Sequence, residues 1–303
     1  MVTELITPRE VPLGGLRAMT VRRTLPTRER SLIGAWCFLD HYGPDRVAET
    51  GGMQVARHPH TGLATVSWLF TGAVDHLDSA GNSARVVPGE LNLMTAGRGI
   101  THSEFSTEDT ETLYGVQLWF ALPDSHRHGD PGFDHYRPEP IAIDGGEILV
   151  FLGSLAGSTS PVETATELVG AELRLQPGAQ LTLAVDPRHE HGVLVDTGSA
   201  ALGEVQLAEG ELGFAAAGSG TLEIAAGEHG ARLVLIGGEP FGEQIVMWWN
   251  FIGRTHDEVA EYRDAYQHEI TTGEPGRFGP WPDGTPDPIP APPMPNMRLR
   301  PRG

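Results

Sequence analysis

Short segments in which apolar and polar residues alternate make up much of the first half of the chain. Residues 64–70 (ATVSWLF), 90–94 (ELNLM) and 113–122 (LYGVQLWFAL) follow this pattern. An alternation with a period of two residues is typical of β-strands, because successive side chains point to opposite faces of a sheet. Glycine or proline flanks each segment, as at turns between strands. The pattern therefore predicts antiparallel strands joined by short connections.

A second set of strand-like segments follows a stretch rich in Pro, Gly, Asp and His at 123–140. Regular spacing of such segments with glycine-rich turns predicts a sandwich or a barrel. The predicted strands are 147–152, 171–175, 180–185, 192–195, 211–215, 220–225 and 231–236. The two halves look like a loose duplication of one β-architecture. We predict an N-terminal domain at 1–135, a C-terminal domain at 136–272 and a tail at 273–303.

One helix is predicted near the C-terminus. Thr255 and Glu258 form a Thr-x-x-Glu capping box, in which each side chain can accept a hydrogen bond from an unpaired backbone amide. Val259, Tyr262 and Tyr266 then recur at helical spacing, with charged residues between them. The sequence therefore predicts an amphipathic helix that packs one face against the body of the protein.

The tail that follows this helix is dense in proline and has no core-forming pattern of its own. Such a segment is either disordered or extended along another surface. Phe278, Trp281 and Met294 give it apolar side chains, so docking is favoured over disorder.

Composition and charge narrow the class of protein. The chain has 303 residues, of which 39% are hydrophobic, and its formal net charge is −19. An acidic surface repels phosphate backbones, so direct binding of nucleic acid is not expected. No apolar run reaches the length of about 20 residues that a membrane helix needs, and the N-terminus does not resemble a signal peptide. Cys37 is the only cysteine, which fits a reducing cytoplasm, and its apolar neighbours favour simple burial.

Candidate chemistry is concentrated in two short motifs, His58-Pro59-His60 and His102-Ser103-Glu104. On a strand, residues i and i+2 point to the same face, so each pair converges on one point. Enough chain separates the pairs for several strands, so they can face each other across a barrel. Three imidazoles and one carboxylate suit a divalent first-row metal ion.

The sequence contains two further His-x-His pairs. His126 and His128 lie in a loop rich in Pro, Asp and Gly, and we interpret them as solvated surface. His189 and His191 precede a strand where a duplicated barrel would place its own first pair. No matching second pair follows at the spacing seen in the first half, so this pair is interpreted as vestigial or structural, with a second metal site as the alternative.

Three longer segments of the sequence resemble the pirin family, a branch of the cupin superfamily. The resemblance is carried by HPHTGLATVSWLF, by PGELNLMTAGRGITHSEF and by IGGEPFGEQIVMWWNFIGRTHDEV, and it runs from about Trp36 to about Tyr266. It implies an all-β bicupin fold of two stacked, jelly-roll-like antiparallel barrels with a short C-terminal helix.

The resemblance also implies one metal ion, in the N-terminal barrel only, most often iron(II). Its ligands would be His58, His60, His102 and Glu104, the set already reached from strand geometry. Imidazole also suits nickel, copper, manganese and zinc, so the metal is iron by resemblance alone. The general cupin pattern has a glutamate a few residues after the first histidine pair. Ala64 stands there instead, which leaves Glu104 as the carboxylate ligand.

Three functions remain open from the sequence. Four protein ligands on an ion that prefers six leave about two open positions, and the pirin resemblance implies quercetin 2,3-dioxygenase activity on a flavonol or another enolisable aromatic substrate. If Glu104 loosens from the metal, it would then be the general base that takes the substrate hydroxyl proton. Alternatively, the chain is a non-enzymatic, redox-sensing regulatory protein that acts through protein partners. A third interpretation is a structural metal that only stabilises the barrel.

Overall fold

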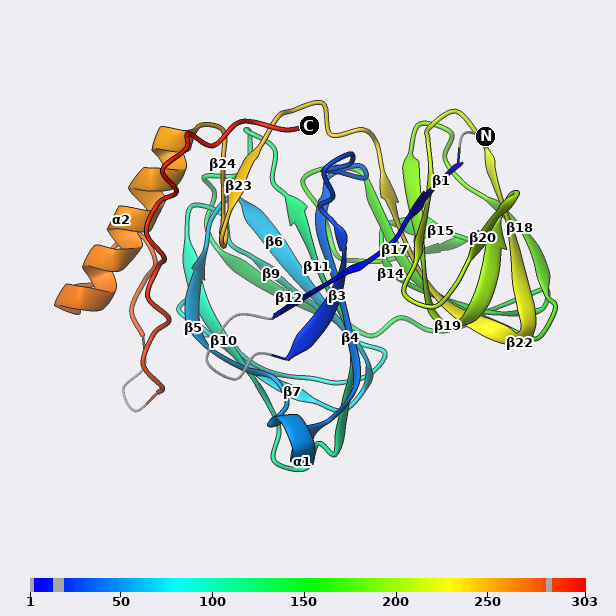
Figure 1. The fold of residues 1–303 in the computed structure, drawn as a ribbon, viewed down its shortest axis with the longest axis horizontal. Coiled ribbons are helices and arrows are strands. Elements are labelled where there is room, and N and C mark those ends of the chain that lie inside the picture. Colours follow the sequence, from blue (N-terminus) through cyan, green and yellow to red (C-terminus); the bar gives the residue numbers. More distant parts are fainter. Residues whose placement is uncertain (1–2, 13–18, 282–284) are drawn as a thin grey trace.

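The fold is described by a computed structural model for residues 3–12, 19–281 and 285–303. Sheets of seven, four and nine strands form the body of the described chain. Figure 1 shows two barrels side by side, with one long helix at the outer flank of the first barrel. The predicted all-β architecture, two stacked antiparallel barrels with a C-terminal helix, is therefore confirmed.

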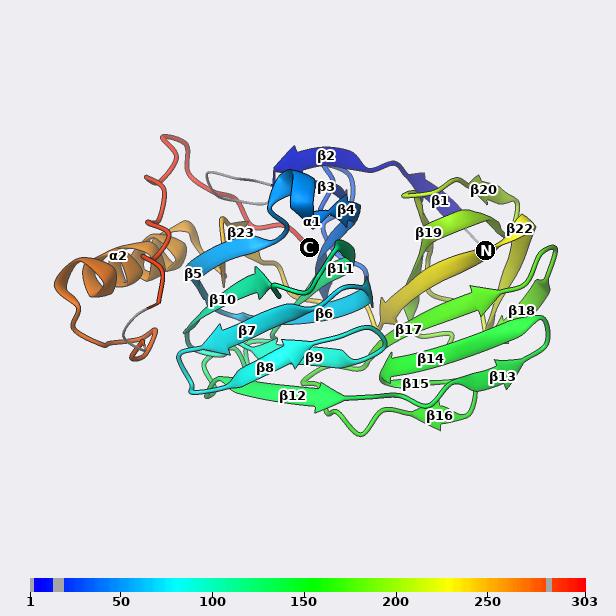
Figure 2. The same cartoon turned by 90° about the horizontal axis from the view of Figure 1, so that it is seen from below.

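The first barrel is built from the seven-stranded and the four-stranded sheet (Figure 2). The seven-stranded sheet has the order β12 (Gly132–Tyr136), β9 (Leu91–Thr95), β6 (Leu63–Thr71), β11 (Thr112–Ala121), β4 (Trp36–Arg46), β3 (Thr20–Leu25) and β2 (Arg9–Pro12). The four-stranded sheet has the order β5 (Gln54–His60), β10 (Ile100–Ser106), β7 (Val74–Asp78) and β8 (Ser83–Val86). A single helical turn, α1 (Val47–Thr50), follows β4.

The second barrel is built from the nine-stranded sheet. Its main path is β1 (Thr3–Ile6), β21 (Leu212–Ala215), β19 (Glu190–Leu202), β22 (Thr221–Gly238), β17 (Leu168–Leu175), β14 (Gly146–Leu152) and β13 (Ile141–Ile143). Off this path, β18 (Gln180–Ala184) pairs with β22 and β20 (Val205–Leu207) pairs with β19. Two small hairpins are formed by β15 (Ser154–Leu155) with β16 (Ser158–Thr159), and by β23 (Val246–Trp248) with β24 (Phe251–Gly253).

Both faces of the central strands of the seven-stranded sheet are buried. On β11, Val116, Leu118 and Phe120 join a core cluster that also contains Phe151 and other residues of the second barrel. The alternate side chains of β11 point into the first barrel. The sequence of β11 alternates although both of its faces are buried. Its second face lies inside a barrel that also contains polar groups.

Cys37, on the neighbouring strand β4, packs among the apolar residues Leu63 and Ile252. Its side chain is buried, and burial raises the pKa of its thiol well above its usual value. The interpretation of Cys37 as a packing residue agrees with this environment, because a protonated, inaccessible thiol is a poor nucleophile.

Buried polar contacts also join the two barrels. Trp68 of β6 donates from Nε1 to Oε2 of Glu172 on β17 at 2.7 Å. His41 of β4 lies with Nε2 2.7 Å from Oδ1 of Asp196 on β19, and both side chains are fully buried. Arg232 of β22 also pairs with Asp196. Asp196 therefore links a histidine of one barrel to an arginine of the other.

Replacing Asp196 with Asn is expected to lower the free energy of unfolding by about 3 kcal/mol, because breaking a buried ion pair leaves Arg232 without a counter-charge. Glu209→Gln is the control, since Glu209 is 49% exposed and pairs with Arg22 at the surface. We expect that change to cost no more than about 0.5 kcal/mol. Urea unfolding at neutral pH measures both. Equal effects would mean that the contacts of Asp196 do not stabilise the junction of the barrels.

Strand β1 and the β23–β24 hairpin each cross from one barrel to the other. The N-terminal strand β1 pairs with β21 of the second barrel. In the opposite direction, the β23–β24 hairpin returns to the first barrel, where Ile252 donates its backbone amide to the Thr61 carbonyl at 3.0 Å. The division into domains at 1–135 and 136–272 stays a prediction, and each predicted domain contributes a strand or a hairpin to the other barrel.

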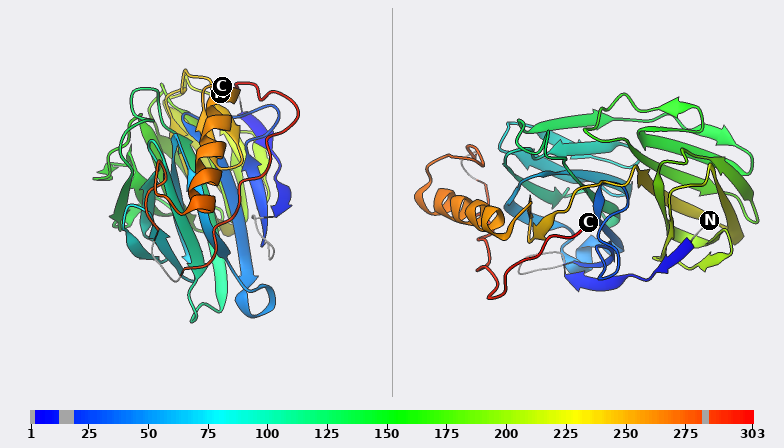
Figure 3. Two further views of the ribbon diagram at one scale, coloured as in Figure 1. Left: turned by 90° about the vertical axis from the view of Figure 1, so that its left-hand side faces the viewer. Right: turned by 90° about the horizontal axis from the view of Figure 1, so that it is seen from above.

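The C-terminal helix α2 (His256–Thr272) packs on the first barrel, on the side away from the second (Figure 3). Its N-cap is the predicted Thr255, whose hydroxyl accepts from the Glu258 amide at 3.1 Å. Val259, Tyr262 and Tyr266 are buried, as their spacing predicts. No helix among the described residues is long and apolar enough to cross a membrane.

The tail docks along α2 and the first barrel (Figures 1 and 3). Phe278 and Ala291 are buried in the cluster that contains the apolar face of α2. The Ile289 amide donates to the Arg57 carbonyl at 2.8 Å, and near its end Arg302 pairs with Ile245 through two backbone hydrogen bonds. The apolar side chains of the tail therefore have the docking role that the sequence favours.

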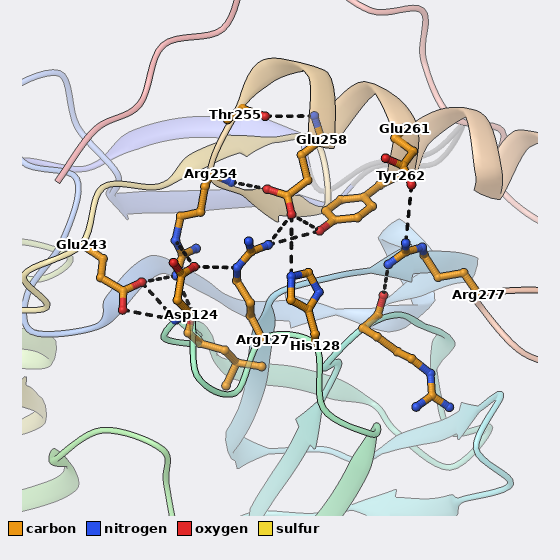
Figure 4. A network of polar contacts seen from close by, with 12 residues as sticks. Asp124, Arg127, His128, Glu243, Arg254, Thr255, Glu258, Glu261, Tyr262 and Arg277 are labelled. Atoms are coloured by element: carbon orange, nitrogen blue, oxygen red, sulfur yellow. Dashed lines mark hydrogen bonds and ion pairs between the residues drawn. The ribbon is translucent and has the colours of Figure 1, made fainter.

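Glu258 is the centre of a polar network that holds α2 to the first barrel (Figure 4). It pairs with Arg127 from the loop after β11, and it accepts from the Tyr262 hydroxyl at 2.6 Å and from the Arg254 amide at 2.7 Å. Burial alone would raise the pKa of Glu258, but the hydrogen bonds from Arg127, Tyr262 and Arg254 lower it to about 2.

A depressed carboxyl pKa stabilises the fold above the unfolded value of about 4.3, and this stabilisation is lost as pH falls toward about 2. Glu258→Gln is therefore expected to cost about 2 kcal/mol at neutral pH, and the difference from the wild type should shrink below about pH 4. Urea titrations at several pH values measure this. Glu261→Gln, 71% exposed on the same helix, should leave the profile unchanged. A difference that does not depend on pH would contradict the role of the charge.

Candidate metal centre

The four predicted ligands lie on one face of the four-stranded sheet. In the antiparallel register, His58 of β5 lies opposite His102 of β10, and His60 lies opposite Ile100. Glu104 follows two residues after His102, and all four side chains are buried. The structure brings the two motifs together, but not across a barrel as the sequence analysis expected. They sit on adjacent hydrogen-bonded strands, because β10 pairs directly with β5.

Backbone carbonyls orient two of the imidazoles. His58 donates from Nδ1 to the Ala56 carbonyl at 2.9 Å, and His60 donates from Nδ1 to the Asn250 carbonyl at 3.2 Å. With the proton on Nδ1, the Nε2 atom of each ring keeps a free lone pair. The Nε2 atoms of His60 and His102 lie 3.1 Å apart. The rings of His58 and His102 have their centroids 4.3 Å apart, so three imidazoles converge.

Burial keeps these imidazoles neutral. It lowers the pKa of His58 to about 4, and it lowers the pKa values of His60 and His102 well below the usual range. Mutual repulsion of the protonated rings acts in the same direction for His60 and His102. At neutral pH the three rings are therefore uncharged, which is the form of histidine that binds metal ions.

Glu104 is displaced along β10 toward His76 of β7. The pairing of β10 with β5 shifts register between His102 and Glu104, so Glu104 lies opposite Val55 on β5 and His76 on β7. Its ligand atoms group with those of His102 and His76, whereas His58, His60 and His102 form the other group. Burial raises the pKa of Glu104, and a hydrogen bond from Ser67 at 3.2 Å only partly offsets this.

Sequence reasoning missed His76 and Asp78. Both are buried on β7, next to β10, and their side chains lie on the face that carries the four predicted ligands. The motif His76-Leu77-Asp78 has the same i, i+2 spacing as the two motifs that were found. That spacing was the available signal, but it contains a single histidine.

A turn from the second half of the chain completes the site. The β23–β24 hairpin places Asn250 against His60, and its neighbour Trp249 has a left-handed backbone with φ of 51°. Such a conformation is uncommon for a bulky residue and is found mostly where surrounding contacts enforce it. The Trp249 ring packs near Phe251 and Tyr266, with centroids 5.5 and 5.9 Å away. The orientation of His60 therefore depends on a segment 190 residues away in sequence.

A cavity of about 390 Å³ opens onto the four predicted ligands. Most of its other lining residues are apolar or aromatic, and they come from the first barrel, the β23–β24 hairpin and the tail. They are Pro12, Arg23, Pro26, Phe38, Met53, Val55, Gln117, Trp119, Met247, Trp248, Trp249, Asn250 and Ile289. A pocket of this size and lining, with a few polar groups at one end, is typical of sites for small organic ligands.

The aromatic wall of this cavity is held in place by stacking. The rings of Phe38 and Trp119 stack with centroids 4.0 Å apart and an interplanar angle of 10°. The Arg23 guanidinium covers the Phe38 ring at 4.2 Å and binds the buried Asp40 through two hydrogen bonds of 2.6 and 2.7 Å. The cavity thus offers flat apolar surfaces and one fixed cationic group.

The other histidine pairs have different surroundings. His126 and His128 are exposed, which agrees with their interpretation as surface residues, whereas Arg127 between them anchors α2. In the second barrel, His189 lies near the carboxylates of Glu167 and Asp186. Arg188 pairs with both of these carboxylates, so an arginine already supplies positive charge there.

Comparison with known families gives two matches along the chain. The family described as Pirin matches residues 18–120, and the Pirin C-terminal cupin domain matches residues 170–271. A Pseudomonas aeruginosa protein provisionally named a quercetin 2,3-dioxygenase is 41% identical over 263 residues, which cover 86% of this chain and 82% of that protein. A pirin-like protein of Caulobacter vibrioides is 33% identical, over 80% of this chain and 85% of its own.

Solved structures give the same picture. A crystal structure of quercetin 2,3-dioxygenase from Acinetobacter baumannii has a TM-score of 0.89 and 37% identity, and covers 98% of this chain and 97% of its own. A bacterial pirin from Escherichia coli, YhhW, solved in complex with nickel(II), shares the fold at 20% identity. Its TM-score is 0.63, with 79% of this chain and all of that chain covered.

Proposed function

Because this chain belongs to the pirin family of cupin proteins, we propose that His58, His60, His102 and Glu104 bind one divalent metal ion and that the site oxygenates a flavonol-like or other enolisable aromatic substrate. The observation that carries the proposal is the convergence of three neutral imidazoles in the lining of an aromatic cavity, with the buried carboxylate of Glu104 two residues from His102 on the same strand. Two relatives named for quercetin 2,3-dioxygenase support the substrate class.

The donor set fits a metal ion on physical grounds. With its proton on Nδ1, His60 presents a lone pair on Nε2 toward Nε2 of His102, only 3.1 Å away. Two imidazole nitrogens bound at about 2.0–2.1 Å to one ion, at right angles, would lie about 3 Å apart. The spacing between the two nitrogens is therefore that of two neighbouring ligands. Iron(II) is the metal we favour, and nickel, copper, manganese and zinc also accept this donor set.

Each group of the chain then has a part in the chemistry. When bound, the metal would supply Lewis acidity and redox activity toward dioxygen. Glu104 would take the proton of the substrate hydroxyl, since burial raises its pKa and makes it a stronger base than an exposed carboxylate. Ser67 would hold the carboxylate in place through its hydrogen bond.

The cavity would orient a flat aromatic substrate. Trp119 and Phe38 form one stacked wall, and Trp248 and Trp249 come from the hairpin on another side. The guanidinium of Arg23 stands beside that wall and would attract a phenolate or another anionic oxygen. Aromatic walls exclude water and leave orientation to a few polar groups, as is usual for sites that bind small organic molecules.

The proposal is tested on purified protein by elemental analysis and by dioxygen uptake. We expect about one equivalent of a first-row metal per chain, and uptake that requires both the metal and a flavonol such as quercetin. Separate reconstitution with iron(II), nickel(II) and manganese(II) identifies the active ion. A metal-replete protein that consumes no dioxygen with any phenolic substrate would contradict the enzymatic role.

The non-enzymatic alternative makes a different prediction. A redox-sensing regulatory protein would bind a protein partner with an affinity that changes between the ferrous and ferric states. The net charge of −19 favours contacts with basic protein surfaces over contacts with nucleic acid. Equal partner binding by both oxidation states would count against this alternative.

A further inference from the structure

A row of three buried side chains lies behind the candidate metal centre. His102 of β10 has its Nδ1 atom 3.4 Å from Nδ1 of His76, and Nε2 of His76 lies 3.3 Å from Oδ2 of Asp78. Exposed fractions are 1%, 4% and 1% for His102, His76 and Asp78. The register explains the row, because β7 lies beside β10 and places Asp78 opposite His102 and His76 opposite Glu104.

Asp78 can only accept hydrogen bonds in this arrangement. Its Oδ1 atom accepts from the amides of Ala80 and Asn82, at 2.9 and 3.0 Å, and from the Asn82 side chain at 3.1 Å. Its Oδ2 atom accepts from the same side chain at 2.9 Å. All of these partners are N–H donors, so the Oδ2 atom of Asp78, which faces His76, is a hydrogen-bond acceptor. The turn after β7 thus fixes the carboxylate in place and in its role.

The positions of the protons follow from this acceptor. Since Oδ2 of Asp78 accepts, Nε2 of His76 must carry the proton that it donates. When His76 carries this single proton, its Nδ1 atom is an acceptor, and Nδ1 of His102 donates to it. The remaining nitrogen of His102, Nε2, has a free lone pair, and this is the atom that lies 3.1 Å from Nε2 of His60.

We infer that Asp78 and His76 are positioning residues, which fix the orientation and the tautomer of His102 so that its Nε2 atom faces the metal position. This inference rests on the proposed function in so far as His102 is a metal ligand. His58 and His60 obtain the same tautomer from backbone carbonyls. His102 obtains it from a two-residue side-chain relay. Partners of this kind, which act through a ligand, typically change metal affinity about 10- to 100-fold.

His76 has a different part from the three ligand histidines, although its ligand atoms group with those of His102 and Glu104. Its Nε2 atom is engaged by Asp78, and its Nδ1 atom faces Nδ1 of His102, on the opposite side of that ring from His60. An ion bound by His76 would therefore lie away from Nε2 of His60. The relay uses both nitrogens of His76 and leaves Nε2 of His102 for the cavity side.

Asp78→Asn gives the most specific test. The carboxamide oxygen can keep the contacts that Oδ1 makes with Ala80 and Asn82, while the second contact from the Asn82 side chain is lost. The carboxamide nitrogen is then left to donate to Nε2 of His76. His76 must then carry its proton on Nδ1 and donate to Nδ1 of His102, which moves the His102 proton to Nε2. Long-range ¹H–¹⁵N spectra of the metal-free protein, labelled at histidine, distinguish the two tautomers. We expect His102 to be protonated at Nδ1 in the wild type and at Nε2 in the variant.

Zinc(II) affinity, measured by competition with a chromophoric chelator, gives the second readout. Asp78→Asn and His76→Leu are expected to weaken zinc binding about 10- to 100-fold. His76→Asn should restore much of it, because an amide oxygen close to the former Nδ1 position can still accept from His102. Asp75→Asn is the matched control, since Asp75 lies on the same strand, is exposed and pairs with Arg85.

Three results would overturn the relay. These are an unchanged His102 tautomer in Asp78→Asn, equal losses in His76→Asn and His76→Leu, and a loss in Asp75→Asn as large as that in Asp78→Asn. A wild type that fails to bind zinc(II) would instead contradict the proposed function. In that case, the tautomer of His102 in the metal-free protein still tests whether Asp78 and His76 orient His102.

Discussion

The double substitution His58→Ala/His60→Ala is expected to abolish stoichiometric metal binding and, with it, flavonol-dependent dioxygen uptake. Loss of partners that only support a ligand already lowers metal affinity about 10- to 100-fold, so removal of two direct ligands should exceed that range. Both side chains are buried on β5, with their Nδ1 protons committed to backbone carbonyls. Alanine supplies no donor at either position, and Glu104 and His102 alone hold a divalent ion weakly.

Equilibrium dialysis against iron(II) or nickel(II), followed by elemental analysis, measures the loss. The second barrel supplies a matched control, because His189→Ala/His191→Ala removes a pair of the same spacing, of which His191 is also buried. That variant should keep its metal and its dioxygen uptake per folded molecule. A control that loses metal as completely as the first variant would place the site in the second barrel or in both.

Glu104→Gln is expected to lower flavonol turnover by about 10²- to 10⁴-fold, the usual contribution of a positioned general base. Glutamine has nearly the same shape and can still accept from Ser67, but it cannot take up a proton. Three imidazoles remain, so we expect the metal content to stay close to that of the wild type. The decisive comparison is therefore turnover per bound metal, measured by dioxygen uptake under saturating substrate.

Glu90→Gln is a suitable control for this experiment. Glu90 is a buried glutamate of the same barrel, with 8% exposure against 7% for Glu104, and it pairs with Arg137 and His135 instead of lining the cavity. Its substitution should affect stability and leave turnover per folded molecule unchanged. Full turnover by Glu104→Gln with metal bound would contradict the assignment of Glu104 as the base. The substrate would then have to enter the cavity already ionised.

Local patterns in the sequence were sufficient for much of the fold. The two-residue alternation at 64–70 and 113–122 predicts strands, and both become central strands of the seven-stranded sheet. The Thr-x-x-Glu motif predicts the start of α2, and Thr255 is its N-cap. These signals work because the backbone geometry of a strand or of a helix terminus depends on a few consecutive residues.

The candidate site depends on features that such local patterns do not determine. Spacing alone places His58 beside His60 and His102 near Glu104, because residues two apart on a strand share a face. It does not show that β10 lies between β5 and β7, or that a register shift turns Glu104 toward His76. Strand order and register come from packing between distant segments, which one sequence does not display.

The sequence by itself thus determined the strand-rich architecture, the cap of α2 and two pairs of candidate metal donors. Only the tertiary structure decided that the pairs are neighbours in one sheet, that Asn250 from the second half orients His60, and that Asp78 and His76 stand behind His102. The physical reason is the range of the interactions. Periodicity and capping act within a few residues, whereas the tautomer and direction of a buried imidazole depend on whichever distant group packs against it.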